Sequence, residues 1–245
     1  MPLQKVNDPY KHVSFIYPEL MRFVSYKWWA RYIFFISKKH LNKNPKVLEI
    51  AGGNCSLAKY LRKQYYLYIV SDISFSMLNS SKVDVARVCC NMIKLPFKEK
   101  FDLIISSFDS VNYLTSKKQL KALFDEVNNI LSDNGIFTFD ASLENNSYKH
   151  QKYADNHKGK IAGYLFKGKS VYLPASKIHK NIFWITDAKG NNLIETHRQK
   201  IFSFQTYFDL CEKSGLYVVN CYKAFSIQRG SSKSDRVQFV MKRKK

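Results

Sequence analysis

The segment KVLEIAGGNCSLAKYL, residues 46–61, predicts a buried strand, a turn of small residues and then a helix. The apolar run is short enough for a strand, and the small residues at 51–53 end it. Small residues in such a turn let a ligand approach the backbone closely, and the N-terminus of the following helix favours negative charge. Because purely structural turns have the same composition, the assignment of a binding turn depends on the rest of the sequence.

Strands and helices continue to alternate beyond this segment. Apolar runs predict further strands at 66–74, 87–97, 101–110, 136–142, 216–227 and 236–244. Helical spacing predicts helices at 56–64, 117–135 and 204–215. Gly135 would form the left-handed C-cap of the long helix. This alternation predicts an α/β fold with a mostly parallel, Rossmann-like sheet of seven strands and helices on both faces.

Two segments depart from the alternation. Apolar residues from Tyr17 to Leu41 recur at helical spacing, which predicts a helical region near the N-terminus. Residues 144–160 are polar and predict a loop, whereas residues 164–202 are β-rich and contain a hairpin turn at 187–192. We therefore expect an N-terminal helical lid at 1–44, a Rossmann-like domain at 45–143 and 203–245, and an inserted antiparallel β cap at 144–202.

Two carboxylates mark the ends of the first two strands. Asp72 lies at the end of the second strand, where a carboxylate can accept both hydrogen bonds of a ribose diol. The same residue can instead cap the helix that begins near Ser74. The spacing from the first turn favours ribose binding. Glu49, in the first strand, suits the ammonium group of an amino-acid-like ligand.

Consecutive motifs resemble the class I S-adenosylmethionine-dependent methyltransferases over nearly the whole chain. These motifs are VLEIAGG (47–53), SDISFSML (71–78), CCNMIKLPF (89–97), FDLIISSFDSVNYL (101–114) and LKALFDEVNNILSDNGIFTFD (120–140). The resemblance implies that S-adenosylmethionine is the cofactor. It implies a methionine site at Glu49, Ala51, Gly52, Gly53 and Ser107, ribose binding by Asp72, and adenine contacts from Ile73, Met77, Asn91 and Met92.

Two residues differ from the family pattern. Ala51 stands where the first glycine of the motif usually lies, and Cys55 stands where the third usually lies. Alanine is tolerated there if its φ is negative, whereas Cys55 would add bulk next to the cofactor. Both differences concern cofactor affinity, and an inactive cofactor-binding relative is the alternative that they leave open.

The chain resembles, more narrowly, a bacterial small-molecule group of this family, in which some sugar and amine N-methyltransferases look similar in outline. The likeness rests on Tyr10 with Tyr17, on DSVNYL at 109–114 and on ETHRQ at 195–199. We expect methyl transfer to nitrogen or oxygen of a small-molecule acceptor. His197 is the candidate catalytic base. The alternative is that His197 is a surface histidine that pairs across the strands of a hairpin. Tyr17 and Asp109 are further catalytic candidates, and Tyr10 would cover the cofactor; packing or turn formation would also explain them.

The charge of the chain leaves a second class of acceptor open. The formal net charge is +21, from 40 Lys and Arg against 19 Asp and Glu. Such a charge attracts nucleic acid, so an RNA-modifying methyltransferase is the alternative function. Its basic surface would comprise Lys149, Lys152, Lys158, Lys160, Lys167 and Lys169. The phrase typical of nucleobase-methylating enzymes is missing at Ser107–Ser110, which disfavours a base-flipping enzyme.

No secretory leader or membrane span is expected, because the first residues are polar and charges interrupt the most apolar stretch, 15–36. The five cysteines have neither metal-ligand nor disulfide-framework spacing, which indicates a cytoplasmic protein without a metal site. An aromatic helix containing Trp28, Trp29, Phe34 and Phe35 would suit a membrane surface, or packing against its own domain, which we favour.

Overall fold

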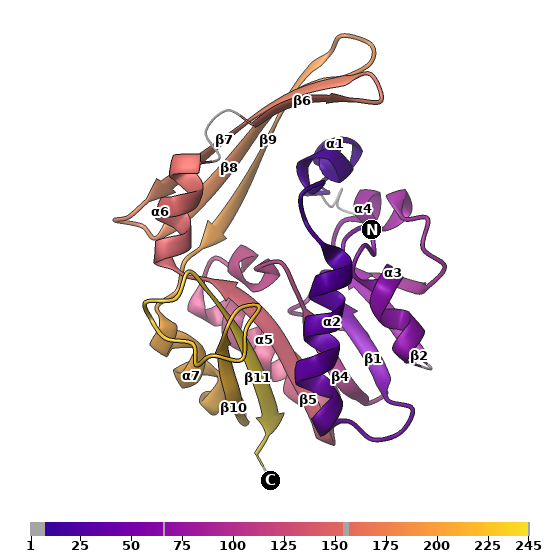
Figure 1. The fold of residues 1–245 in the computed structure, drawn as a ribbon, viewed down its shortest axis with the longest axis vertical. Coiled ribbons are helices and arrows are strands. Elements are labelled where there is room, and N and C mark those ends of the chain that lie inside the picture. Colours follow the sequence, from indigo (N-terminus) through magenta and orange to yellow (C-terminus); the bar gives the residue numbers. More distant parts are fainter. Residues whose placement is uncertain (1–7, 66, 154–156, 245) are drawn as a thin grey trace, which may run out of the picture.

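The computed structural model describes residues 8–65, 67–153 and 157–244, and its strands form two sheets (Figure 1). The main sheet has the order β10-β11-β5-β4-β1-β2-β3. Its strands are β1 Lys46–Ile50, β2 Leu67–Asp72, β3 Ala86–Cys89, β4 Phe101–Ser106, β5 Leu131–Ser142, β10 Leu216–Lys223 and β11 Arg236–Arg243. β1 to β5 pair in parallel, whereas β11 pairs antiparallel with β5 and β10. The predicted fold class is confirmed.

Helices cover both faces of the main sheet. They are α2 Tyr26–Ser37, α3 Ala58–Leu61, α4 Phe75–Ser80, α5 Lys117–Ile130 and α7 Phe204–Lys213, with short 3-10 turns η1 Lys38–His40, η2 Arg62–Gln64 and η3 Ser110–Tyr113. Leu48 packs in the apolar cluster of α5 and α7, and its neighbour Val47 packs in the cluster of α2 and α3. The strands are apolar on both sides because both faces are buried.

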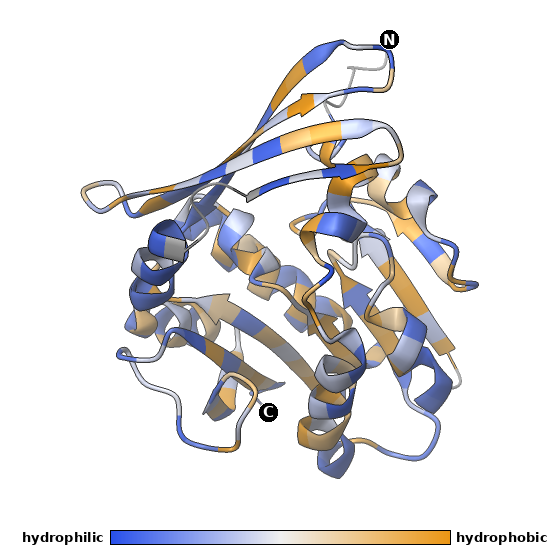
Figure 2. Cartoon of the chain, turned by 45° about the horizontal axis from the view of Figure 1, so that its top comes forward, coloured by the Kyte–Doolittle hydropathy of each residue, from blue (hydrophilic) through white to orange (hydrophobic). Residues whose placement is uncertain are grey.

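The second sheet arches over one end of the main sheet (Figures 1 and 2). It consists of β6 His157–Ile161, β7 Tyr164–Leu173, β8 Ile178–Thr186 and β9 Asn192–Lys200, all antiparallel. The hairpin turn predicted at 187–192 is confirmed, since Asp187 Oδ1 accepts hydrogen bonds from the backbone N–H of Lys189 and Asn191. Burial alternates along β7 and β9, so one face of this sheet is turned inward and the other is exposed. The exposed side chains include the apolar residues Leu165, Trp184 and Ile194.

The loop predicted at 144–160 is wrong. Residues Glu144–Tyr153 form helix α6, which packs against β7. The contacts that hold α6 on β7 are polar. The Tyr172 hydroxyl donates to Glu144 Oε1 at 2.7 Å, and Gln151 Oε1 accepts from the backbone N–H of Tyr172 at 2.5 Å. A helix held by such contacts has no apolar stripe, so the periodicity of hydrophobic residues does not reveal it.

The long helix also ends earlier than Gly135. α5 stops at Ile130, its C-cap Leu131 is extended, and Gly135 lies inside β5. A Cβ on Gly135 would lie 2.8 Å from Ser132 Oγ and 3.0 Å from the carbonyl oxygen of Asp102. The glycine is therefore required for close packing against the neighbouring strand, and the predicted C-cap is wrong.

The helical region predicted from Tyr17 to Leu41 is two helices that pack on different sheets. α1 (Val13–Leu20) shares an apolar cluster with Phe166 of the second sheet, whereas α2 buries Trp29 against the main sheet. Trp28 remains 47% exposed at the surface of α2. Within the described ranges no helix is both long and apolar enough to cross a membrane. Packing on its own domain therefore accounts for Trp29 and its buried neighbours, whereas Trp28 and Phe35, at 54% exposed, remain at the surface of α2.

Candidate active site

A cavity of about 560 Å³ lies between the carboxyl ends of the parallel strands, the N-terminal segment and the second sheet. Ligands of open α/β sheets bind at this edge. All predicted site residues except Asn91 line the cavity: Tyr10, Tyr17, Glu49, Ala51, Gly52, Gly53, Asp72, Ile73, Met77, Met92, Ser107, Asp109 and His197. Asn91 is exposed, and its Oδ1 accepts a hydrogen bond from the backbone N–H of Ile93, so it forms a local turn.

The turn after β1 is held by hydrogen bonds to β2. Gly52 donates its N–H to the carbonyl of Ser71 at 3.0 Å, and Gly53 donates to Asp72 Oδ2 at 2.8 Å. A Cβ on Gly52 would lie 2.5 Å from Val70 Cγ1, and one on Gly53 would lie 3.0 Å from Met77 Cε. Both positions therefore require glycine, and the floor of the cavity is backbone.

Ala51 and Cys55 both adopt left-handed backbone conformations, with φ of 55° and 62°. We expected Ala51 to be tolerated if its φ were negative. Its φ is positive, so the Cβ of Ala51 is unfavourable here. Cys55 is fully buried, belongs to the apolar cluster of α2 and α3, and does not line the cavity. Its bulk is therefore accommodated in the core and does not narrow the cavity, contrary to our expectation.

Asp72 lies where both of its predicted roles are possible. Its Oδ1 accepts from the backbone N–H of Ser74 at 2.8 Å, and Ser74 itself is the N-cap of α4. Burial raises the pKa of Asp72 to about 6, although the N–H groups of Ser74 and Gly53 oppose this. The carboxylate is thus fixed at the cavity wall, oriented by the backbone.

Glu49 is a buried carboxylate at the other side of the turn. Its Oε2 accepts a hydrogen bond from the Tyr68 hydroxyl at 2.7 Å. Burial, together with the charge of Asp72, raises the pKa of Glu49 to about 8, against the effect of that hydrogen bond. No described residue forms an ion pair with it. A cationic ligand group would therefore find a carboxyl group without an ion-pair partner, and the ligand's charge would favour the ionised form of Glu49.

The N-terminal segment is fastened across the cavity at three points. Asp8 accepts hydrogen bonds from the Ser74 hydroxyl at 2.5 Å and from the backbone N–H of Ser76 at 2.7 Å. The hydroxyl groups of Tyr10 and Tyr113 are hydrogen-bonded to each other. Glu195 Oε2 accepts from the backbone N–H groups of His12 and Val13, where α1 begins. Three residues of these contacts were not among the site residues expected from the sequence: Asp8, Tyr113 and Glu195.

His197 is paired with Glu195 on the same strand. Its Nε2 lies 2.8 Å from Glu195 Oε1, and the imidazole is only 4% exposed. The imidazole ring lies against the Tyr10 ring, with ring centroids 4.2 Å apart. The Tyr17 ring packs edge-on against the same Tyr10 ring, with centroids 6.2 Å apart. The two-residue spacing of Glu195 and His197 on a strand places them on one face, a signal that the sequence contained.

Asp109 is in a buried charge cluster. Its Oδ2 lies 3.2 Å from Arg236 Nη2, and Arg236 also forms an ion pair with Asp140. Burial raises the pKa of Asp109, and the charge of Arg236 opposes this. Phe108 and Asp109 both have a left-handed φ, which directs the strand end into η3. Asp109 thus already has a cationic partner, which sequence reasoning missed.

Comparison with known proteins identifies the family. Residues 47–135 match the sequence model described as a methyltransferase domain. A Geobacillus protein named as a methyltransferase is 25% identical over 96% of this chain and 99% of its own length. The solved S-adenosylmethionine-dependent methyltransferase of Clostridium acetobutylicum has a TM-score of 0.79 at 20% identity, covering 96% of this chain and 99% of that one. Residues 47–135 thus form a methyltransferase domain, and the relatives and solved structures together support a class I S-adenosylmethionine-dependent methyltransferase.

The fold is shared more widely, since the sugar N-methyltransferase structure from a Streptoalloteichus species has a TM-score of 0.74 at 13% identity, covering 93% of this chain and 91% of that one. The cofactor of the methyltransferase is S-adenosylmethionine. The described residues fit it. Glu49 offers an unpaired carboxylate, and the buried Ser107 Oγ has no hydrogen-bond partner among the described residues.

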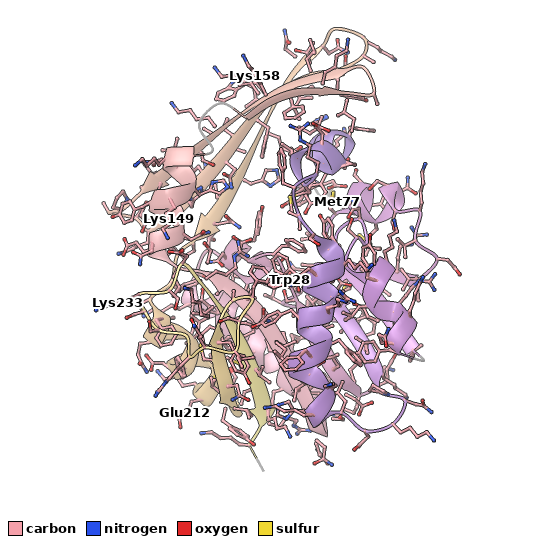
Figure 3. The ribbon with its side chains drawn as sticks, in the orientation of Figure 1. Trp28, Met77, Lys149, Lys158, Glu212 and Lys233 are labelled. Carbon is pink, nitrogen blue, oxygen red and sulfur yellow. The ribbon has the colours of Figure 1, made fainter. Side chains whose placement is uncertain are left out.

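The basic residues of the methyltransferase that were proposed for RNA lie mostly away from the cavity. Lys158, Lys160, Lys167 and Lys169 alternate with inward residues of β6 and β7, and Figure 3 shows Lys158 on the second sheet. Lys149 pairs with Asp235 at 2.6 Å. Of the six lysines, Lys169 alone is among the described residues that line the cavity, so the six do not surround it.

Proposed function

We propose that the methyltransferase transfers the methyl group of S-adenosylmethionine to a nitrogen or oxygen atom of a small-molecule acceptor. The observation that carries the proposal is that one cavity joins the Gly52–Asp72 turn to the polar inner face of the second sheet, under α1. This shape suits an acceptor that is enclosed. Only one of the six lysines considered for RNA, Lys169, lines the cavity, so the RNA alternative has less support than an enclosed acceptor.

The cofactor would be held by residues of β1, β2, α4 and the end of β4. Glu49 would pair with its ammonium group, and Ser107 would bind at the same methionine end. Asp72 would accept hydrogen bonds from the ribose hydroxyls. Ile73, Met77 and Met92 would enclose the adenine, with Asn91 outside the cavity. When bound, the cofactor supplies an electrophilic methyl group on a positively charged sulfur.

The rest of the chemistry is alignment and proton removal by this chain's own residues. His197 would accept a proton from the acceptor, and the carboxylate of Glu195 beside its Nε2 would stabilise the imidazolium. Tyr10 and Tyr17 would exclude water and orient the acceptor, because α1 covers the cavity. Asp109 would pair with Arg236 and so stabilise the part of the cavity wall next to η3.

Calorimetric titration with S-adenosylmethionine and S-adenosylhomocysteine tests the cofactor half of the proposal. We expect the native protein to bind both, and Asp72→Asn to lose most of the affinity because the amide accepts one hydrogen bond fewer from the ribose. Asp133→Asn is the control, since its carboxylate is 91% exposed and remote from the cavity. Failure of the native protein to bind either compound would contradict the proposal and indicate an inactive relative.

A screen for release of S-adenosylhomocysteine tests the acceptor half. Small amines and hydroxyl compounds should support turnover, and His197→Asn should lower kcat while leaving cofactor affinity unchanged. Total RNA, offered in parallel, should not be methylated. Turnover with RNA alone would overturn the assignment of a small-molecule acceptor.

A further inference from the structure

Four polar side chains have no part in the transfer described above: His150, Ser170, His179 and Asn181. They lie together under the second sheet, and all line the cavity. Ser170 Oγ is 2.9 Å from His150 Nδ1 and donates to Asn181 Oδ1 at 2.5 Å. Ser170 and Asn181 are directly opposite in the β7–β8 pairing, and α6 packs against β7. We call this group the polar subsite.

His179 has a ring nitrogen without a partner. Its side chain is only 3% exposed, and Nδ1 makes no hydrogen bond to any described residue. Burying a polar atom without a hydrogen bond is unfavourable, so such atoms in native proteins point to a water molecule or a ligand. Because His179 lines the cavity, a ligand atom in the cavity can supply the missing bond.

His179 is a neutral member of the polar subsite. Burial and the nearby His150 lower the pKa of His179 to about 4, so its imidazole is neutral at pH 7. The nearby carboxylates are engaged elsewhere: Glu144 binds Lys177 and Tyr172, and Glu195 binds His197 and the start of α1. A cationic ligand group would therefore enter this end of the cavity without a free carboxylate as its counter-ion, which is costly.

Neutral imidazole, hydroxyl and carboxamide groups each offer hydrogen-bond donors and acceptors. A ligand hydroxyl matches them because it both donates and accepts. Phe183, two residues from Asn181 on the same face of β8, adds an apolar ring to the same cavity. Hydroxyl groups on a saturated ring would thus find polar partners on one side and an apolar surface on the other.

From this arrangement we infer that the polar subsite binds the hydroxyl groups of a sugar-like part of the methyl acceptor, with His179 as a specificity-determining residue. This inference rests on the proposed function, since it places the acceptor at this end and the cofactor at the turn after β1. The nucleophilic atom of the acceptor would then lie toward His197.

The test uses the full chain saturated with S-adenosylhomocysteine and labelled with ¹⁵N-histidine. The probes are methyl glycosides of glucose, galactose, mannose and xylose, and cyclohexanol is the matched ring with a single hydroxyl. At least one glycoside should shift the His179 ring resonances, identified by their loss in His179→Phe. That glycoside should bind about tenfold more tightly than cyclohexanol, and His179→Phe should remove about tenfold of its affinity.

Two further variants separate the subsite from the fold. Ser170→Ala should weaken glycoside binding by roughly threefold, in case His179→Phe fails to fold. Tyr172→Phe is the control: Tyr172 is paired with His179 across the strands, but its hydroxyl binds Glu144 and it does not line the cavity. Tyr172→Phe should therefore bind the glycoside as the native protein does.

The outcomes distinguish the inference from the proposed function. If S-adenosylhomocysteine binds but no glycoside shifts the His179 resonances or binds more tightly than cyclohexanol, the inference is overturned and the proposed function stands. Equal loss of glycoside binding in Tyr172→Phe and His179→Phe would also overturn it, because a general disturbance of the sheet would then explain the loss. If S-adenosylhomocysteine itself does not bind, both proposals fail.

Discussion

The two ends of the cavity are built in different ways. The cofactor end comes mainly from the stretch between β1 and α4, with Met92 and Ser107 added from farther along the chain, and its key groups are backbone N–H groups and two oriented carboxylates. The acceptor end combines α6, the second sheet and the N-terminal segment, which are distant in sequence. A local motif can therefore specify the cofactor, whereas tertiary packing determines the acceptor site. Changes at the two ends should have separable effects.

Gly52→Ala should have the largest effect, and at the cofactor end alone. The added Cβ would lie 2.5 Å from Val70 Cγ1, so we expect the free energy of unfolding to fall by about 2–3 kcal/mol and cofactor binding to be lost. Gly190→Ala is the control. Its φ is 85°, but nothing lies within 4 Å of the added Cβ, and chemical denaturation should show a loss of only about 1 kcal/mol with cofactor binding intact. Equal cofactor affinity in native protein and Gly52→Ala would contradict this account.

Glu195→Ala should act at the acceptor end. It removes the acceptor for the backbone N–H groups of His12 and Val13, at 2.9 and 3.3 Å. Loss of about 2 kcal/mol should accelerate hydrogen exchange of these amides roughly thirtyfold. Glu212→Ala, which removes an exposed pair with Lys244, should leave their exchange unchanged. Unaltered exchange in Glu195→Ala would show that Glu195 does not fasten α1.

Much of the fold, and of the cofactor end, could be predicted from sequence because the signals are local. The order of strands follows from apolar runs, and the Gly52–Gly53 turn and Asp72 follow from their positions after two strands. The acceptor end gave weaker signals. α6 is held by polar contacts through Glu144 and Gln151, so hydrophobic periodicity could not reveal it.

Long-range pairing explains the other omissions. Arg236 begins the last strand with no feature that marks it as the partner of Asp109, and the partners of Asp8 lie on α4. His179 was indistinguishable in sequence from other strand residues, because its importance depends on burial and on an unpartnered nitrogen. By contrast, Glu195 and His197 are two residues apart on a strand and so share a face, a local signal from which Glu195 could have been selected together with His197.

Glu49 should give the cofactor end a pH dependence opposite in sign to that of His179 at the acceptor end, whose pKa is lowered to about 4. Its pKa is raised from 4.5 to about 8 by burial, so the folded state binds a proton more tightly than the unfolded state does. The free energy of unfolding of the cofactor-free protein should therefore decrease as pH rises between these values, by on the order of 1 kcal/mol per pH unit. Denaturation of Glu49→Gln should show a shallower slope. A slope unchanged by the substitution would mean that other groups cause it.

Ala51→Gly should have the smallest effect, and a stabilising one. Ala51 has a φ of 55°, in the left-handed region that disfavours a Cβ, so glycine should relieve the strain at the cost of greater freedom in the unfolded chain. The net gain in unfolding free energy should be about 0.5–1 kcal/mol. Ala162→Gly, at a φ of 48° in the turn between β6 and β7, should give a similar gain. Only Ala51→Gly should also change cofactor affinity, since Ala51 lines the cavity and Ala162 does not. Equal cofactor affinity in the two variants would mean that the strain in the turn after β1 is a property of the fold alone and does not reach the bound cofactor.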